Sequence, residues 1–133
     1  MTVLTLTAAN IRAVSVIDQS TAPAGVALTR GQVVRVGTAG KWVLANATNT
    51  TNLGSRRGIV LKDVGADEPV TVLHKGTIDL NPALDALAFG ASVFVSDTSG
   101  ALDDAAGTVS SVAGTVVAGW AETSVARLLR IDL

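Results

Sequence analysis

The sequence has no cysteine and no tyrosine, and its 133 residues include only two phenylalanines, two tryptophans and one histidine. Without cysteine, disulfide bonds, thiolate nucleophiles and thiolate metal sites are excluded. Because large aromatic side chains are so few, the 21 alanines and 19 valines must supply most of the core. The length fits a single domain over residues 1–133 with one hydrophobic core.

Neither a concentration of charge nor a long apolar run is present. Ten basic residues stand against eleven acidic ones, and like charges form no block. A nucleic acid is therefore not expected as a direct partner, because binding to a phosphate backbone needs clustered Lys and Arg. A membrane span needs roughly 18 to 20 apolar residues, and the absence of such a run predicts no membrane partner. Residues 1–10 lack the pattern of a signal peptide, so we expect a protein made in the cytoplasm and used without export.

Short runs of β-branched residues, bounded by Gly, Pro, Asn and Asp, recur along the chain. Such runs are typical of strands, because the side chains of Val, Ile and Thr are restricted in a helix and pack well on a pleated surface. The sequence therefore predicts an all-β fold. The expected strands are 3–7, 13–17, 32–36, 41–45, 58–62, 70–75, 77–80, 92–95, 108–112, 116–122 and 126–131.

Two segments do not follow the strand pattern. Residues 81–87 begin with Asn-Pro, which favours a helix start because Asn can cap the first turn and Pro has a helical φ. We predict one short helical turn near residues 81–87. Residues 45–52 are rich in Asn and Thr, so an exposed, mobile loop is expected there.

An internal repeat is the most informative pattern. Leu28–Val36 and Leu87–Val95 share the pattern L-x-x-G-x-x-V-x-V, 59 residues apart. A glycine before V-x-V suits a turn or bulge that leads into a strand whose alternate valines face one core. The repeat predicts a small closed β-barrel or sandwich built from two related halves, at about 24–76 and 83–133, with a possible N-terminal arm at 1–10.

Later features of the two halves also correspond. A turn glycine follows each copy of the repeat, at Gly40 and at Gly100. Further along, a strand that opens on glycine begins at Gly58 in the first half and at Gly119 in the second. Neither half has enough apolar surface to fold alone, so we expect the two to share one core.

Groups able to act in catalysis are scarce. His74 is the single histidine, and alternation along its strand places it on one face with Val70 and Val72, which indicates a structural or interface histidine. No serine lies in a G-x-S-x-G motif. We therefore expect no enzyme and no cofactor; a small hydrolase that uses a serine with His74 or Lys75 is the alternative.

Carboxylates cluster at Asp67-Glu68 and at Asp103-Asp104, next to Gly, Ala or Pro. Aspartate in such a context commonly binds the nearby backbone. Neither pair has the spacing of a calcium-binding loop. We predict that both pairs take part in turns and that no metal is bound.

Several residues could contact another protein. The N-terminal segment alternates like a strand and lies outside the repeat, so it can add to an edge of another chain or pair within its own barrel. Each tryptophan is either an interface anchor or a core residue, and the adjacent arginines can contact an acidic surface or end a solvated loop. The candidate interface residues are Thr2, Val3, Leu4, Thr5, Leu6, Trp42, Arg56, Arg57 and Trp120.

The segments Ala24–Val34 and Leu87–Val95, with the later strands of each half, carry a family resemblance. Through them the sequence resembles the capsid cement, or head decoration, proteins of tailed bacteriophages. The resemblance covers about residues 24–133. The second half departs from the family pattern in its short connection Thr123–Val125, where the first half has Asp63–Pro69.

The resemblance implies a β-barrel-like fold and a homotrimer on the outside of an icosahedral shell, at or near local threefold positions. It also implies that the major capsid protein is the partner and that no reaction is catalysed. The expected function is that of a virion structural protein, made in the host cytoplasm, that stabilises the assembled capsid by bridging major capsid proteins. The alternative is another virion or surface binding module, such as a tail or carbohydrate-binding β domain.

Overall fold

The structure is a computed structural model that describes residues 3–80, 83–121 and 124–133. Within these residues nine strands form one antiparallel sheet, which confirms the all-β prediction. The strands are β1 (Arg12–Pro23), β2 (Val33–Val36), β3 (Trp42–Leu44), β4 (Arg57–Val60), β5 (Pro69–Asp79), β6 (Ser92–Val95), β7 (Leu102–Asp103), β8 (Val112–Ala121) and β9 (Ser124–Asp132). Two short helices are η1 (Ala8–Asn10) and α1 (Thr50–Leu53).

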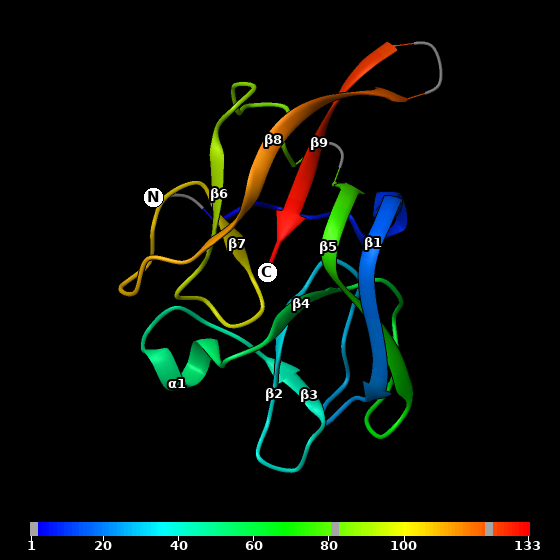
Figure 1. The fold of residues 1–133 in the computed structure, drawn as a ribbon, viewed down its shortest axis with the longest axis vertical. Helices are drawn as coiled ribbons and strands as arrows, with labels where there is room; N and C mark the ends of the chain where they lie inside the picture. Colours follow the sequence, from blue (N-terminus) through cyan, green and yellow to red (C-terminus); the bar gives the residue numbers. More distant parts are fainter. Residues whose placement is uncertain (1–2, 81–82, 122–123) are drawn as a thin grey trace.

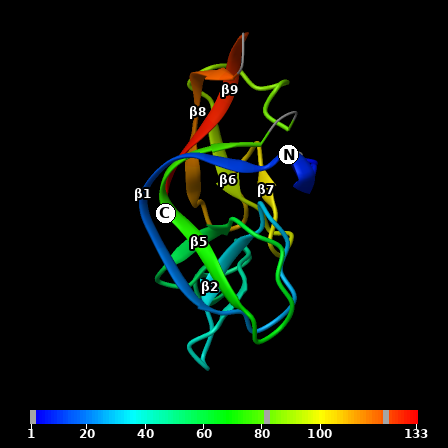
Figure 2. The same ribbon diagram turned by 90° about the vertical axis from the view of Figure 1, so that its right-hand side faces the viewer.

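The strand order relates the first half of the chain to the second. From one end of the sheet to the other the order is β3-β2-β4-β5-β9-β8-β6-β7, so each strand of the first half has a counterpart at the same distance from the centre. The sheet curls into a half-barrel (Figure 1). Strand β1 lies off this path and pairs with β5, and it curves along the outside of the molecule (Figure 2).

Strand pairing shows which residues of the two halves correspond. Val34 pairs with Gly58 in the first half, and Val93 pairs with Gly114 in the second. Val34 and Val93 hold the same place in the repeat, so Gly114 is the counterpart of Gly58. The expected counterpart, Gly119, is wrong, because it lies further along β8 in the hairpin with β9. The error arises because β8 is longer than β4 and contains a second glycine.

The glycines of the repeat have the same conformation and the same backbone partner. The φ angle is 88° at Gly31 and 87° at Gly90, in the left-handed region that favours glycine. The Gly31 N–H donates to the Val60 oxygen at 2.9 Å, and the Gly90 N–H donates to the Val116 oxygen at 2.8 Å. Both halves therefore use one kind of turn to enter β2 and β6.

The two halves meet where β5 pairs with β9. Lys75 lies directly opposite Asp132, and their Nζ and Oδ1 atoms are 3.6 Å apart. Three residues earlier in each strand, Val72 and Leu129 are counterparts, since they pair with equivalent residues of β4 and β8. The strand orders of the two halves therefore mirror each other about the Lys75–Asp132 pair.

One large core lies inside the curl of the sheet and takes residues from both halves. Val33 and Ile59 enter it from the first half, and Val93 and Val116 from the second. The neighbouring residues of β2, β4 and β5 point to the other face, where a smaller core forms around Trp42 under the segment 24–28. Strands β2, β4 and β5 are therefore covered on both faces.

The two ends of the sheet are not joined by a strand ladder within the described residues. Loop backbones from the two halves bridge the opening instead. The Ala47 N–H donates to the Ser96 oxygen at 2.8 Å, and the Val33 N–H donates to the Gly100 oxygen at 3.0 Å. The Gly100 N–H donates in turn to the Ala45 oxygen at 2.8 Å. The two halves thus make a half-barrel whose open side is bridged by loops.

Several strand boundaries differ from the prediction. The strands expected at 70–75 and 77–80 form one strand, β5, and the strand expected at 108–112 contributes only its last residue, to β8. Residues 3–7 form no ladder, and only Val3 makes a bridge, to β7. Strand β7 has two residues, too few for a sequence pattern to mark it.

The prediction of an exposed loop over residues 45–52 is wrong in two respects: two of its alanines are buried, and its last residues begin a helix. Ala45 and Ala47 are fully buried beneath the opening of the half-barrel. The end of the segment begins α1, which Asn49 caps by accepting a hydrogen bond from the Asn52 N–H at 2.8 Å. Polar composition predicted exposure, but the small side chain of alanine lets these positions pack in the core.

The short helical turn predicted near residues 81–87 takes the form, where the structure describes it, of hydrogen-bonded turns rather than a helix. The Ala83 N–H donates to the Leu80 oxygen at 2.9 Å, and the Leu87 N–H donates to the Leu84 oxygen at 3.0 Å. The predicted cap, Asn81-Pro82, lies outside the described residues.

Candidate functional site

The N-terminal segment packs against its own chain. The Leu4 N–H donates to the backbone of β7 at 2.9 Å, next to the bridge that Val3 makes with the same strand. Leu4 and Leu6 pack on the large core, whereas Val3 and Thr5 are exposed. Thr2 lies outside the described residues. Of the two pairings open to this segment, the structure has the one within its own barrel, and the outward face stays a predicted contact.

An apolar groove of about 360 Å³ runs beside this segment. The segment forms one wall, and the turn over residues 83–87 forms the other. The lining residues are Val3, Leu4, Thr5, Thr7, Ala83, Ala86, Leu87 and Asp104. Since Asp104 is the one titratable residue in this lining, the groove suits packing against an apolar surface better than catalysis.

Strand β1 is exposed over most of its length. All eight residues from Arg12 to Gln19 are exposed, and the exposed fractions of Val14, Val16 and Ile17 are 51%, 46% and 66%. In the described part of the chain β1 pairs only with β5, so its outer backbone edge is unpaired. The register with β5 shifts at three points, and such bulges discourage the addition of another strand. What β1 offers a partner is therefore its apolar side chains.

The two tryptophans lie in different parts of the sheet, and the structure describes only the Trp42 side chain. Trp42 is only 3% exposed in the smaller core, with its ring centroid 5.5 Å from that of His74. The interface interpretation of Trp42 is wrong for this chain, because a buried indole cannot reach a partner. Trp120 lies in β8 near the β9 hairpin, and its side chain is not among those described.

The adjacent arginines have separate surroundings. Arg56 is exposed and forms an ion pair with Asp18 of β1, with 3.4 Å between Nη2 and Oδ2. Arg57 is half-buried and its Nη1 donates to the Gly54 oxygen at 2.9 Å. Directly across the β2–β4 pair from Arg57 lies a second arginine, Arg35. Arg56 thus fastens β1, whereas Arg57 faces a like charge.

The clustered carboxylates take part in turns, as predicted. The Gly65 N–H donates to Glu68 Oε1 at 2.8 Å, and the Ala105 N–H donates to Asp103 Oδ1 at 3.1 Å. Asp67 has a positive φ of 68° and pairs with Lys41 at 2.6 Å. These roles are structural: the hydrogen bonds lie within turns, and the Lys41–Asp67 pair joins two loops.

Asp63 fastens the loop after β4 to the turn before β2. The Arg30 N–H donates to Asp63 Oδ1 at 2.9 Å, and this hydrogen bond holds the pKa of Asp63 below its ordinary value. The Arg30 guanidinium adds an ion pair at 3.4 Å. Because both groups are solvated, the pair contributes little to stability.

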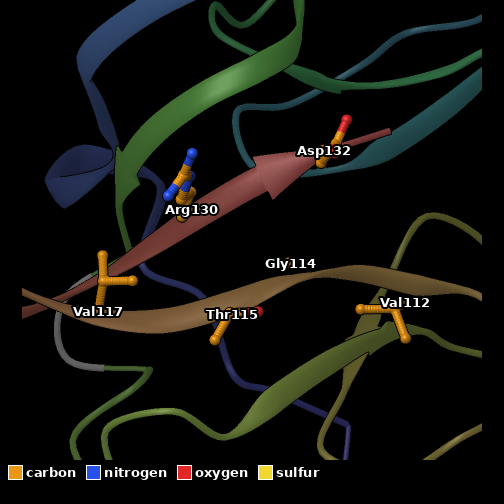
Figure 3. A pocket seen from close by; sticks show the side chains of 6 residues that line it. All are labelled: Val112, Gly114, Thr115, Val117, Arg130 and Asp132. Carbon is orange, nitrogen blue, oxygen red and sulfur yellow. The ribbon is translucent and has the colours of Figure 1, made fainter.

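A wider hollow of about 550 Å³ lies on the outer face of β8 and β9. Figure 3 shows Val117 and Arg130 near one end of it, and Val112 and Asp132 near the other. Gly114 forms part of its floor, where a Cβ atom would lie 2.2 Å from the Arg130 oxygen. The strands approach so closely there that no side chain fits at Gly114.

His74 is 1% exposed and hydrogen-bonds in two directions. Its Nδ1 lies 2.6 Å from the Arg57 oxygen, and its Nε2 lies 2.7 Å from Ser20 Oγ. Because a carbonyl oxygen can only accept, Nδ1 carries a proton. In the neutral imidazole, Nε2 then accepts from the Ser20 hydroxyl. The imidazole therefore ties β5 to β4 and to β1, which fits the structural role predicted for it.

With His74 neutral, the Ser20 hydroxyl donates to Nε2, as the hydroxyl of a catalytic serine donates to its general base. This arrangement bears on the hydrolase alternative. His74 is buried, however, and neither residue lines the apolar groove or the hollow on β8 and β9. Lys75 forms an ion pair with Asp132. The geometry favours a structural hydrogen bond over a catalytic dyad.

Among the residues that the structure describes, no three His, Asp or Glu side chains gather as a metal ion would require. In the same residues no helix has the length and apolar character to cross a membrane. No protein-family model matches the chain, and a search of curated proteins finds no match.

Proposed function

We propose that this protein binds the outer surface of a tailed-bacteriophage capsid and stabilises the assembled shell by bridging major capsid proteins. The proposal is carried by the two L-x-x-G-x-x-V-x-V segments, which resemble those of capsid decoration proteins and occupy equivalent places in the sheet. On this proposal the protein is a non-enzymatic homotrimer of the virion, seated at local threefold positions.

Such a role needs adhesion rather than chemistry. A protein that binds only the assembled shell stabilises that state by mass action. A subunit that bridges several capsid proteins rebinds quickly when one contact opens, because the remaining contacts keep the effective concentration high. Many weak contacts can therefore hold a shell together.

Two surfaces of the chain support adhesion to a protein. Strand β1 exposes the apolar side chains of Val14, Val16 and Ile17. The outward face of the N-terminal segment, with Val3 and Thr5, borders the apolar groove. Gathered apolar side chains on a surface are typical of a binding site.

Co-sedimentation with shells tests the proposal. The purified chain is mixed with expanded shells of the phage that encodes it, prepared without their decoration layer, and the bound fraction is measured after pelleting. We expect saturable binding, a higher temperature of shell disassembly, and a trimer by sedimentation equilibrium. Binding to an oligosaccharide panel but not to shells would establish the carbohydrate-binding alternative instead. Labelling of Ser20 by a fluorophosphonate would favour the hydrolase.

The predicted contact on the N-terminal segment has its own test. Deleting the segment would remove Leu4 and Leu6 from the core, so point changes on its outward face are better. We expect Val3→Asp with Thr5→Asp to weaken shell binding by about tenfold or more, because charges would enter an apolar contact. Thr38→Asp, in the exposed β2–β3 turn, is the matched control. Equal binding by all three proteins would remove this segment from the interface.

A further inference from the structure

Arg35 and Arg57 face each other across the β2–β4 pair. Residues directly opposite in an antiparallel pair have their side chains on the same face, with Cβ atoms about 5 Å apart. Two like charges in this arrangement repel each other and destabilise the pair. The sequence therefore keeps an unfavourable feature at the centre of the first half of the sheet.

Both side chains converge on Gly54, the residue that ends α1. Arg57 Nη1 donates to the Gly54 oxygen at 2.9 Å. Gly54 has a φ of 73°, and a Cβ atom added there would lie 2.9 Å from the Cβ of Arg35, so the stem of Arg35 packs on the glycine backbone. Both arginines are half-buried and are held in place from α1 and from the sheet.

The hydrogen-bonding capacity of the two guanidinium groups is not met. The Nε atoms of Arg35 and Arg57 are both buried and have no hydrogen-bond partner among the described residues. Five ion pairs form elsewhere in the described chain, each with an aspartate, and none includes either arginine. Buried donors without acceptors are costly and uncommon in folded proteins.

We propose that Arg35 and Arg57 form a binding site for a carboxylate group carried by an acidic segment of a partner protein. A carboxylate has one charge and two acceptor oxygens, and arginine binds it through paired N–H donors. It would offset the repulsion between the two guanidinium groups and accept hydrogen bonds from their Nη donors. The inference rests on the proposed function, because it makes this acidic segment part of the shell.

A carboxylate suits the site better than a phosphate does. Phosphate sites in proteins commonly use a row of backbone N–H groups. Here the backbone group turned toward the arginines is the Gly54 oxygen, an acceptor, which takes one donor from Arg57 and repels further negative charge. A singly charged ligand is less disfavoured by this oxygen than a phosphate dianion.

Thermal unfolding of the isolated chain tests the site without any shell. The probes are a blocked oligoglutamate peptide and inorganic phosphate, each compared with chloride at equal ionic strength. At about ten times its Kd, the peptide is expected to raise the melting midpoint by about 4 to 6 °C. Phosphate at equal ionic strength is expected to raise it less. Stabilisation by phosphate and not by the peptide, or by neither, would overturn the proposal.

Neutral variants complete this test. Arg35→Gln and Arg57→Gln are expected to abolish the shift caused by the peptide. Their own melting midpoints without peptide should be no lower than that of the parent, because the repulsion is relieved. Arg130→Gln is the matched control, since Arg130 is an exposed arginine with no ion pair in the described chain. An equal loss of the shift in the control would mean that the peptide binds by general charge attraction, and would contradict the site.

Shell binding then separates this inference from the proposed function. The double variant Arg35→Gln with Arg57→Gln is expected to bind shells at least about tenfold more weakly than the parent. If the parent and the double variant bind equally, the function stands and the site fails as a shell contact. If the parent itself does not bind shells, the proposed function fails, whatever the peptide does.

Discussion

Ser20 and Thr21 are adjacent hydroxyls that make one cross-strand hydrogen bond each in different surroundings. Ser20 Oγ lies 2.7 Å from Nε2 of the buried His74, whereas Thr21 Oγ1 lies 2.8 Å from the exposed Thr71 hydroxyl. Ser20→Ala leaves a buried acceptor unsatisfied and should lower the free energy of unfolding by about 1 to 3 kcal/mol. Thr21→Ala should change it by less than about 0.5 kcal/mol, because water replaces the lost partner. Urea unfolding measures both, and equal losses would contradict the structural role of His74.

The sequence predicts some of these residue roles and not others. Alternation along its strand places His74 beside Val72, but its partner Ser20 is 54 residues away, in a strand outside the repeat. The burial of Trp42 depends on the segment 24–28, which covers it from another part of the chain. Arg35 carries no motif, and only the register of β2 with β4 places it opposite Arg57. Such pairings are set by long-range register, which a single sequence does not encode locally.

The turns before β2 and β6 allow a matched test of the N-terminal segment. Gly31 and Gly90 have the same φ, but a Cβ at Gly31 would lie 2.6 Å from Ile11 Cδ1 and 2.7 Å from Leu6 Cδ1, whereas at Gly90 it meets nothing within 4 Å. Gly90→Ala should therefore cost only backbone strain, about 1 to 2 kcal/mol. Gly31→Ala should cost about 1 kcal/mol more from overpacking.

A second substitution checks the cause of this difference. Leu6→Ala in the Gly31→Ala background should recover part of the extra loss, and a double-mutant cycle measures the coupling. The same cycle with Gly90→Ala should show no coupling. Equal costs at the two glycines, or no coupling at Gly31, would mean that the N-terminal segment does not pack there in solution.

Elements built around the repeat were the most predictable. Strands β2 and β6 follow a turn glycine and a V-x-V pattern, and both lie where the sequence predicts them. Strand β5 is predicted as two strands because Gly76 interrupts the β-branched run. In the structure Gly76 keeps the strand continuous with a φ of 146°, and a Cβ there would lie 2.2 Å from the Ser15 oxygen of β1. Glycine here permits a close approach between strands, which the sequence alone does not distinguish from a strand end.

The two halves and the segments outside them contribute different parts of the molecule. The paired halves supply the sheet and the shared core, and their strand order repeats about the Lys75–Asp132 pair. Strand β1 and the N-terminal segment have no counterpart in the second half; they expose Val3, Val14 and Val16, and residues 3–7 line part of the apolar groove. The repeat therefore accounts for the fold. Strand β1 and the N-terminal segment, outside it, supply apolar surfaces proposed for adhesion, whereas the proposed carboxylate site at Arg35 and Arg57 lies within the first half.

Shared packing predicts that the two halves unfold together. The large core contains residues of both halves, and backbone hydrogen bonds such as that from Ala47 to Ser96 join their loops. Calorimetry should therefore show one transition, with equal calorimetric and van't Hoff enthalpies of about 90 kcal/mol, from about 0.7 kcal/mol per residue.

The repeat counterparts Val34 and Val93 test this, since Val34 is buried in the smaller core of the first half and Val93 in the large core. Val34→Ala and Val93→Ala should each lower the midpoint by about 5 °C or more and leave a single peak. A second peak that appears only with Val34→Ala would mean that the first half unfolds by itself and that the loops do not couple the halves.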